Sequence, residues 1–432
     1  MNHTRLTGNS VARERARGVS LIEVLVALAI AALLLLGLSQ IFIGSKQAYS
    51  LQEGMSRSQE NARFVFGTFE SGLRMAGYFG CGNENASSRK FYNHLVAATA
   101  PTPFTQRFQR PLEGFDAAAC TAAGCSNDDQ QPAVGTGNTN WSPTLPDELF
   151  NNLAATARPV AGSDILVLRV LSAESAPTLG PFSPTDGAAF TIAAVPGDPG
   201  FVQPGGIYAI SNCRPRVDIF KAANASAGTS IVTLGSENPY RCDATGSTWG
   251  CTQAEGDFNQ PPLGQLPATL NAEVHKAEYL AYYVGLRQNS DGSETPSLFV
   301  QTIGGIAGEE IADGVESMQL TYGVDADGDG VADSGDFVAA SVINGGAVPA
   351  ACATDPFPDE CKRDLNWRKV VSIHVALLMR GQDRAGGAAP FGGDNAYTVG
   401  GPNGAKMQRP VDGRFRDIYE TTIAVRNRLS SF

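Results

Sequence analysis

An acidic stretch in the last third of the chain has the residue types and spacing of a metal site. Residues 325–336 place carboxylates at the first, third, fifth, ninth and twelfth positions and a glycine at the sixth. Alternating carboxylates around a turn-permitting glycine can wrap a hard cation such as Ca²⁺, and the backbone carbonyl of the seventh residue supplies a further oxygen. The expected ligands are Asp325, Asp327, Asp329, Val331, Asp333 and Asp336.

The alternative for this stretch is an acidic, glycine-rich hairpin loop without an ion. We favour calcium because five carboxylates so close together repel one another unless a cation neutralises them. The stretch resembles the calcium loop of EF-hands and, more closely, that of dockerins, which ends in Asp. It has Asp336 where an EF-hand has a bidentate Glu, and residues 318–324 before it are predicted to form a strand. The expected role of Ca²⁺ is structural, since extracellular calcium would keep such a site filled.

Eight cysteines could form disulfide bonds. All of them follow the apolar segment described below, and their even number favours disulfides in an exported domain. Zinc is the competing interpretation, but the sequence has no Cys-x-x-Cys and no histidine close to a cysteine pair. The sequence alone does not choose among the pairings. We expect Cys120 with Cys125, Cys242 with Cys251, Cys352 with Cys361, and Cys81 with Cys213.

The sequence contains no recognisable catalytic motif. Gly-x-Ser-x-Gly, His-Glu-x-x-His, a Walker loop and a Rossmann fingerprint are all missing, and the four histidines are scattered. The net charge of -11 argues against nucleic-acid binding, which needs a basic surface. We therefore expect neither an enzyme nor a nucleic-acid-binding protein.

The amino terminus combines a basic leader with a long apolar run. Residues 1–18 contain four arginines and one acid, whereas the rest of the chain is acidic. Residues 24–45 carry no charge, and a helix of this length crosses a hydrocarbon layer of ~30 Å. A cleaved secretory signal would have a shorter run. The basic flank predicts a cytoplasmic leader and an exported chain beyond Lys46.

Glu23 lies at the start of this apolar segment and needs a counter-charge. A plain membrane anchor does not explain the acid, because a carboxylate costs ~2.5–3.5 kcal/mol at the bilayer centre. Cleavage between Gly18 and Val19 would create a cationic amine at the tip of the same helix. Glu23 of one subunit can then neutralise the amine of a neighbour during assembly.

Residues 17–23 resemble the cleavage and methylation site of type IV prepilins. The resemblance implies cleavage after Gly18 and N-methylation of Val19, which stands where Phe or Met is commoner. It also implies that Glu23, the fifth residue of the mature chain, acts in assembly.

The expected fold class is α+β, with a long N-terminal transmembrane and stalk helix followed by a large antiparallel, β-sheet-rich, disulfide-bonded head. Apolar residues at helical spacing between residues 51 and 76 extend the helix beyond the membrane. We divide the chain into a leader (1–18), the transmembrane and stalk helix (19–80) and the head (81–432), in which residues 83–162 are a loop-rich insertion. Strands are expected at residues 165–171, 188–195, 206–211, 217–222, 230–234, 279–285, 298–303, 318–324 and 370–378.

Several segments resemble PilW-type minor pilins of type IV pili. They are residues 60–64, 73–81, 162–166, 322–325 and 424–428. The resemblance implies a minor pilin that primes or supports pilus assembly, with the pilus tip as one position and indirect roles in twitching motility and adhesion. Its implied partners are other minor and major pilins, the prepilin peptidase and methylase, and the inner-membrane assembly machinery. The implied location is the inner membrane, with one membrane span and a periplasmic head, and then the pilus at the cell surface.

Two other functions stay open at this point. A minor pseudopilin of type II secretion would share the leader, the stalk and a calcium site, although the junction at residues 78–81 and the number of cysteines favour the pilus. A calcium-dependent tip adhesin would use loop aromatics such as Tyr92, Trp141 and Trp249. Isolated loop aromatics, however, more often cover local core.

Overall fold

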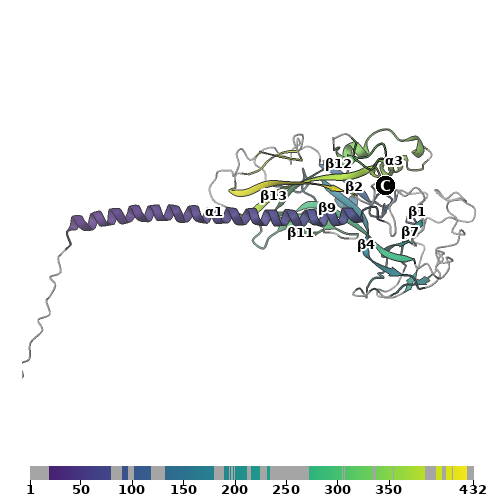
Figure 1. Cartoon of the computed structure of the whole chain (residues 1–432), viewed down its shortest axis with the longest axis horizontal. Helices are drawn as coiled ribbons and strands as arrows, with labels where there is room; N and C mark the ends of the chain where they lie inside the picture. The colour runs from purple at the N-terminus through teal and green to yellow at the C-terminus, as the bar shows by residue number, and fades with distance from the viewer. Residues whose placement is uncertain are drawn as a thin grey trace, which may run out of the picture. The chain divides into compact units, whose positions relative to one another are not determined.

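The protein is α+β, with a long N-terminal helix followed by a head built mainly of antiparallel sheet (Figure 1). It divides into two compact units, residues 1–53 and 54–432. The structure is a computed structural model. It describes residues 19–78, 90–95, 102–117, 132–179, 189–193, 195, 198, 200–211, 216–223, 231–233, 272–303, 305, 307–333, 337–353, 355–384, 396–400, 405–410 and 412–425.

Helix α1 (Leu21–Met75) contains 55 residues and is continuous. In the second unit one of its faces is buried, with Ala62, Val65, Phe69 and Leu73 at most 1% exposed. These residues recur every three or four positions, as expected for one stripe of a helix. They share a hydrophobic core with both large sheets of the head, and Phe69 packs edge-on against Tyr282. The predicted stripe is therefore confirmed as a core-facing surface from Ala62 to Leu73, whereas Met55 is 37% exposed.

The larger sheet has the strand order β1-β7-β6-β9-β4-β2-β3, and β10 and β11 extend it from β9. All of its pairs are antiparallel except β1 with β7. Strands β4 and β9 are the long central pair. The strands are β1 (Lys90–Asn93), β2 (Leu112–Ala117), β3 (Trp141–Ser142), β4 (Ile165–Pro177), β6 (Ile207–Ser211), β7 (Arg216–Lys221), β9 (Glu273–Gln288), β10 (Glu294–Gln301) and β11 (Glu309–Asp313).

The second sheet has the order β12-β13-β16 and is fully antiparallel. Its strands are β12 (Val315–Val324), β13 (Val370–Arg384) and β16 (Arg414–Ala424). Two small pairs complete the described strands, namely β5 (Ala189–Thr191) with β8 (Ile231–Thr233) and β14 (Ala396–Val399) with β15 (Ala405–Gln408). Asp164 links the two large sheets, because its carboxylate accepts the N–H groups of Ala117 and Leu320.

The connection from β12 to β13 carries the acidic loop and two short helices. These are α2 (Ala340–Asn344) and α3 (Pro358–Trp367), with a 3-10 turn at Ala350–Cys352 between them. Trp367 is fully buried and packs edge-on against Tyr322, with ring centroids 5.0 Å apart. The Tyr322 ring also requires Gly114 on β2, since a Cβ there would lie 1.9 Å from its hydroxyl.

Each of the nine expected strands overlaps an observed one. The described part of the expected loop-rich insertion, residues 83–162, contains three short strands among loops and 3-10 turns. Strand β2 pairs with the central strand β4. Trp141, Leu149 and Phe150 are at most 2% exposed and belong to one hydrophobic cluster. The segment therefore completes the core of the larger sheet, although its Ala, Asn and Pro content is typical of loops. Trp141 is thus not available as an adhesive aromatic, and the Tyr92 side chain and Trp249 lie outside the described residues.

Candidate functional site

The amino-terminal end of α1 carries the predicted processing and assembly residues. The carbonyl of Ser20 accepts the N–H groups of Glu23 and Val24, which begins the helix just after Val19. Glu23 lies in the first helical turn, where the positive end of the helix dipole favours an acid. Val19 is 67% exposed, and Gly18 lies outside the described residues. Cleavage between Gly18 and Val19 would therefore place the new amine of Val19 beside the first turn of α1, which contains Glu23.

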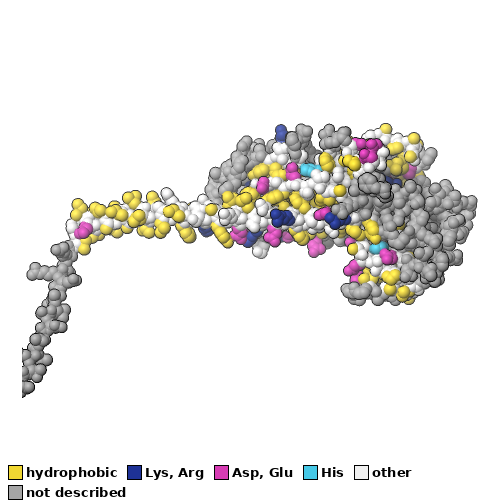
Figure 2. All heavy atoms as spheres, viewed as in Figure 1, with side chains coloured by type: hydrophobic (Ala, Val, Ile, Leu, Met, Phe, Trp, Pro, Cys, Tyr) yellow, Lys and Arg dark blue, Asp and Glu magenta, His cyan; other side chains and the backbone are white. Residues whose placement is uncertain are grey.

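The first half of α1 has an exposed apolar surface. Leu21, Leu33, Ile41 and Phe42 are between 69% and 79% exposed, and Figure 2 shows hydrophobic side chains along this part of the helix. Among the described residues, α1 is the one helix long and apolar enough to cross a membrane. Such a surface is stable in lipid or against other apolar helices, and costly in water.

The acidic loop after β12 brings three of its carboxylates together. One oxygen each of Asp325, Asp327 and Asp333 lies within 4.8 Å of the others. The loop is closed by backbone hydrogen bonds from Asp333 N–H to the carbonyl of Val324 and from Asp325 N–H to that of Lys369. Strand β13 and the end of β12 thereby hold both ends of the loop.

This arrangement fits a calcium ion. Ca²⁺ binds oxygens at 2.3–2.6 Å, so two of its ligands can lie up to ~5 Å apart. The carboxylate of Asp329 is not in the cluster, and its Oδ1 accepts the N–H of Val331 at 2.8 Å. Asp336 lies outside the described residues. The loop thus offers three of the predicted carboxylates as a preformed group.

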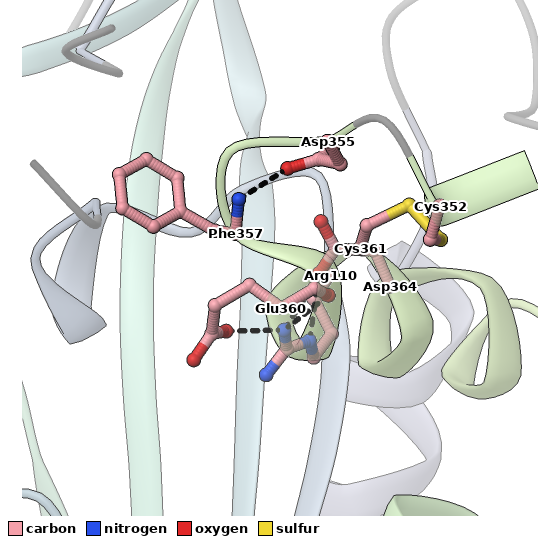
Figure 3. The surroundings of a disulfide bond; sticks show 7 residues. All are labelled: Arg110, Cys352, Asp355, Phe357, Glu360, Cys361 and Asp364. Atoms are coloured by element: carbon pink, nitrogen blue, oxygen red, sulfur yellow. Dashed lines mark hydrogen bonds and ion pairs between the residues drawn. A yellow bond between two sulfur atoms is a disulfide. The ribbon is translucent and has the colours of Figure 1, made fainter. Parts of the chain in front are cut away.

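The structure contains the expected disulfide between Cys352 and Cys361 (Figure 3). The other six cysteines, Cys81, Cys120, Cys125, Cys213, Cys242 and Cys251, lie outside the described residues, so their pairings stay predictions. Cys361 sits on α3 between Glu360 and Asp364, and both acids point toward Arg110 in Figure 3.

Arg110 is the centre of a buried charge cluster that the sequence analysis missed. Its guanidinium is fully buried and bonds Glu113 at 2.5 Å, Glu360 at 2.7 Å and Asp364 at 2.7 Å. Glu113 also contacts the buried guanidinium of Arg169 at 3.2 Å. A buried charge is stable only when paired and hydrogen-bonded, so the cluster joins β2 and β4 to α3.

Acid should weaken this cluster. Burial alone would raise the pKa of Glu113, but the guanidinium groups of Arg110 and Arg169 lower it to about 2 from an ordinary value of 4.5. The stabilising contribution is therefore complete above pH 4.5 and is lost as the pH falls toward 2. Over that interval the free energy of unfolding should fall by up to about 3 kcal/mol through this group. Chemical unfolding at several pH values checks this, and Glu113→Gln should lack this part of the pH dependence.

A second buried cluster holds the β12-β13-β16 sheet together. Glu316 of β12 is fully buried, and Arg416 of β16 binds both of its carboxylate oxygens, at 2.9 and 3.1 Å. Arg409 and Arg380 approach the same carboxylate at 3.2 and 3.5 Å. Asp412 accepts two further hydrogen bonds from Arg416. Glu316 thus faces three arginines of the β13 and β16 region, and Asp412 shares the compensation of Arg416.

Two regions of the chain match known protein families. Residues 281–427 match the family described as type IV pilus-assembly protein W, PilW, and residues 13–39 match the prokaryotic N-terminal methylation motif. No curated protein and no solved structure shows a significant match to the chain.

The PilW match covers less than half of the chain, but it includes most of the features described above. It begins within β9 and runs through β16, so it contains the acidic loop, the disulfide and Glu316. The methylation motif contains Gly18, Val19 and Glu23. The two matches thus support a membrane-anchored, type IV pilus-related minor pilin.

Proposed function

We propose that this protein is a minor pilin that primes or supports type IV pilus assembly at the inner membrane. The observation that carries the proposal is a PilW region and a methylation motif on one chain whose first helix exposes an apolar surface. A priming subunit needs such a surface, since it must leave lipid and pack against the helices of other pilins. A position at the pilus tip and indirect roles in twitching motility and adhesion belong to this proposal, and no catalytic step does.

Processing and orientation follow from the same residues. We expect the prepilin peptidase to cut between Gly18 and Val19 on the cytoplasmic side and to methylate the new amine of Val19. The basic leader keeps that end inside, so the head reaches the periplasm. The partners in assembly are then other minor and major pilins and the inner-membrane machinery.

A clean deletion in the native host tests the proposal. Loss of surface pili with normal type II secretion, restored by the wild-type gene in trans, is the expected result. Loss of secretion with normal pili would instead assign the protein to a type II pseudopilus. Normal pili whose binding to surfaces is lost would favour the adhesin. Scoring pili, secreted proteins and surface attachment in the same cultures separates the three outcomes.

We also propose that the acidic loop binds one structural Ca²⁺. Asp325, Asp327 and Asp333 would hold it, with the carbonyl of Val331 and the carboxylates of Asp329 and Asp336 as the remaining expected ligands. The ion would neutralise the acids where β12 leads into α2. It would thereby stabilise the connection between two strands of the second sheet.

Removal of calcium should lower the melting temperature of the full chain in detergent. A ligand at a hundredfold excess over its Kd adds ~2.7 kcal/mol, which corresponds to roughly 5 °C for a head of this size. The variant Asp327→Asn/Asp333→Asn should melt in calcium at the temperature seen in chelator. Asp291→Asn, which changes an exposed acid in a different glycine-containing loop, is the matched control. A calcium-dependent shift that survives in the double variant would place the ion elsewhere.

A further inference from the structure

The segment between the acidic loop and β13 is held by different kinds of contact along its length. We call its described residues, 337–353 and 355–369, the α2–α3 segment. At its carboxyl end, Trp367 is fully buried, and its indole N–H donates to Asn344 at 3.0 Å. Asn366 donates to the carbonyl of Ile343 at 2.8 Å. Apolar burial and neutral hydrogen bonds thus anchor this end.

The amino-terminal half of α3 depends instead on one covalent bond and on charge. Apart from Lys362, its side chains are not buried. Cys361 joins the fully buried Cys352, while Glu360 and Asp364 bind Arg110 (Figure 3). The disulfide therefore lies on the same helical turn as the two acids that face Arg110.

Arg110 has two of its three acidic partners only when α3 is in place. Arg107, Arg110 and Arg169 face Glu113 from β2 and the two acids of α3. Without α3, three guanidinium groups would share the single carboxylate of Glu113. Leaving one partner of a buried ion pair uncompensated is strongly unfavourable. Docking of α3 thus supplies acids that help to neutralise the arginines around Glu113, between β2 and β4.

We propose that the Cys352–Cys361 bond is a redox latch for the α2–α3 segment. When the bond is closed, Glu360 and Asp364 are presented to Arg110 and α3 is docked. When it is open, the first turns of α3 leave Arg110, and the segment stays attached through Trp367 and through α2, where Ala340 and Ser341 donate their N–H groups to Asp116. The head therefore reaches its final packing only after the two thiols are oxidised in the exported compartment.

The closing step is thiol–disulfide exchange with a protein or low-molecular-weight disulfide oxidant. The thiolate of one cysteine attacks a sulfur of the oxidant and gives a mixed disulfide, and one oxidant thiolate leaves. The second cysteine, as thiolate, then displaces the other oxidant sulfur. The two cysteines lose two electrons and two protons in total, and the oxidant is reduced to its dithiol or to two thiols.

Hydrogen exchange of the full chain in detergent tests the latch. Amides of α3 should exchange about 100-fold faster in Cys352→Ser/Cys361→Ser than in the wild type, while those of β13 stay protected. Glu360→Gln/Asp364→Asn keeps the disulfide and should give a similar increase. In the quadruple variant, the amides of α3 should exchange at most ~3-fold faster than in either double variant, because both pairs of substitutions open the same latch. Asp359→Asn, an exposed acid of α3 that does not face Arg110, is the control and should change exchange less than ~2-fold.

Two results would overturn the proposal. One is α3 exchange in the cysteine variant within ~2-fold of the wild type. The other is a fold increase in α3 exchange in the quadruple variant that equals the product of the increases in the two double variants.

If the cysteine variant does not fold, the latch can be tested by the rate at which dithiothreitol reduces the Cys352–Cys361 bond. Alkylation of Cys352 and Cys361 is followed by peptide mass, which separates this bond from the other cysteines. Release of α3 should expose Cys352, so the bond should be reduced about 10-fold faster in Glu360→Gln/Asp364→Asn than in the wild type. An equal rate in both proteins would contradict the latch.

Discussion

Glu23→Ala is expected to be cleaved normally and to be missing from assembled pili. The acid is the charged residue nearest the tip of α1, at the start of an otherwise apolar surface. If it pairs with the freed amine of Val19 on a neighbouring subunit, its removal leaves that amine unneutralised in an apolar filament core. Loss of one partner of a buried pair typically costs 3–5 kcal/mol, so incorporation should fall at least ~100-fold.

The measurement is the amount of the variant that copurifies with sheared pili, beside a mass measurement of leader removal. Glu70→Ala is the matched control, because Glu70 lies on the same helix, is exposed and pairs with Arg74 within the head unit. Its incorporation should be unchanged. Wild-type levels of cleaved Glu23→Ala in the pili would contradict the pairing.

Glu316→Gln is expected to be the most destabilising single substitution among those proposed for the head. A neutral amide keeps the size of the side chain but leaves Arg380, Arg409 and Arg416 without their common carboxylate. The free energy of unfolding should fall by about 3–5 kcal/mol. Urea unfolding of the full chain in detergent, followed by tryptophan fluorescence, measures the change.

Asp417→Asn provides the comparison for this result. Asp417 is an exposed acid on the same strand as Arg416, so its neutralisation should change stability by less than ~0.5 kcal/mol. If both variants lost the same small amount of stability, the Glu316 cluster would not be what joins β12 to β16.

The parts of this fold that were predictable depend on local sequence. The apolar run and the stripe from Ala62 to Leu73 lie within one continuous helix, so their periodicity is visible directly. The nine strands were recognisable from β-branched and apolar runs. Strand β2 was missed because its sequence, Leu-Glu-Gly-Phe-Asp-Ala, has a glycine and two acids, and Glu113 is buried only because Arg110 and Arg169 are near it.

The charge clusters could not be predicted for a related reason. Arg110 and Glu360 are 250 positions apart, and an isolated Arg or Glu in a sequence is far more often exposed than buried. The acidic loop was partly predictable from the sequence. Its spacing indicated the site, but the structure was needed to show that Asp325, Asp327 and Asp333 converge without Asp329.

The way α1 enters the head has a mechanical consequence. One face of the last turns of α1, from Ala62 to Leu73, is buried in a core shared with both sheets, and Ala76, just after the helix, pairs with Val170 of β4. A Cβ on Gly72 would lie 2.8 Å from Leu168, so helix and sheet are in close contact there. Tension applied along α1 would load this interface in shear. The helix would have to slide past the sheets with all of its contacts breaking together, instead of separating from them one contact at a time. The head should therefore resist being pulled from its helix more strongly than its thermal stability alone would indicate.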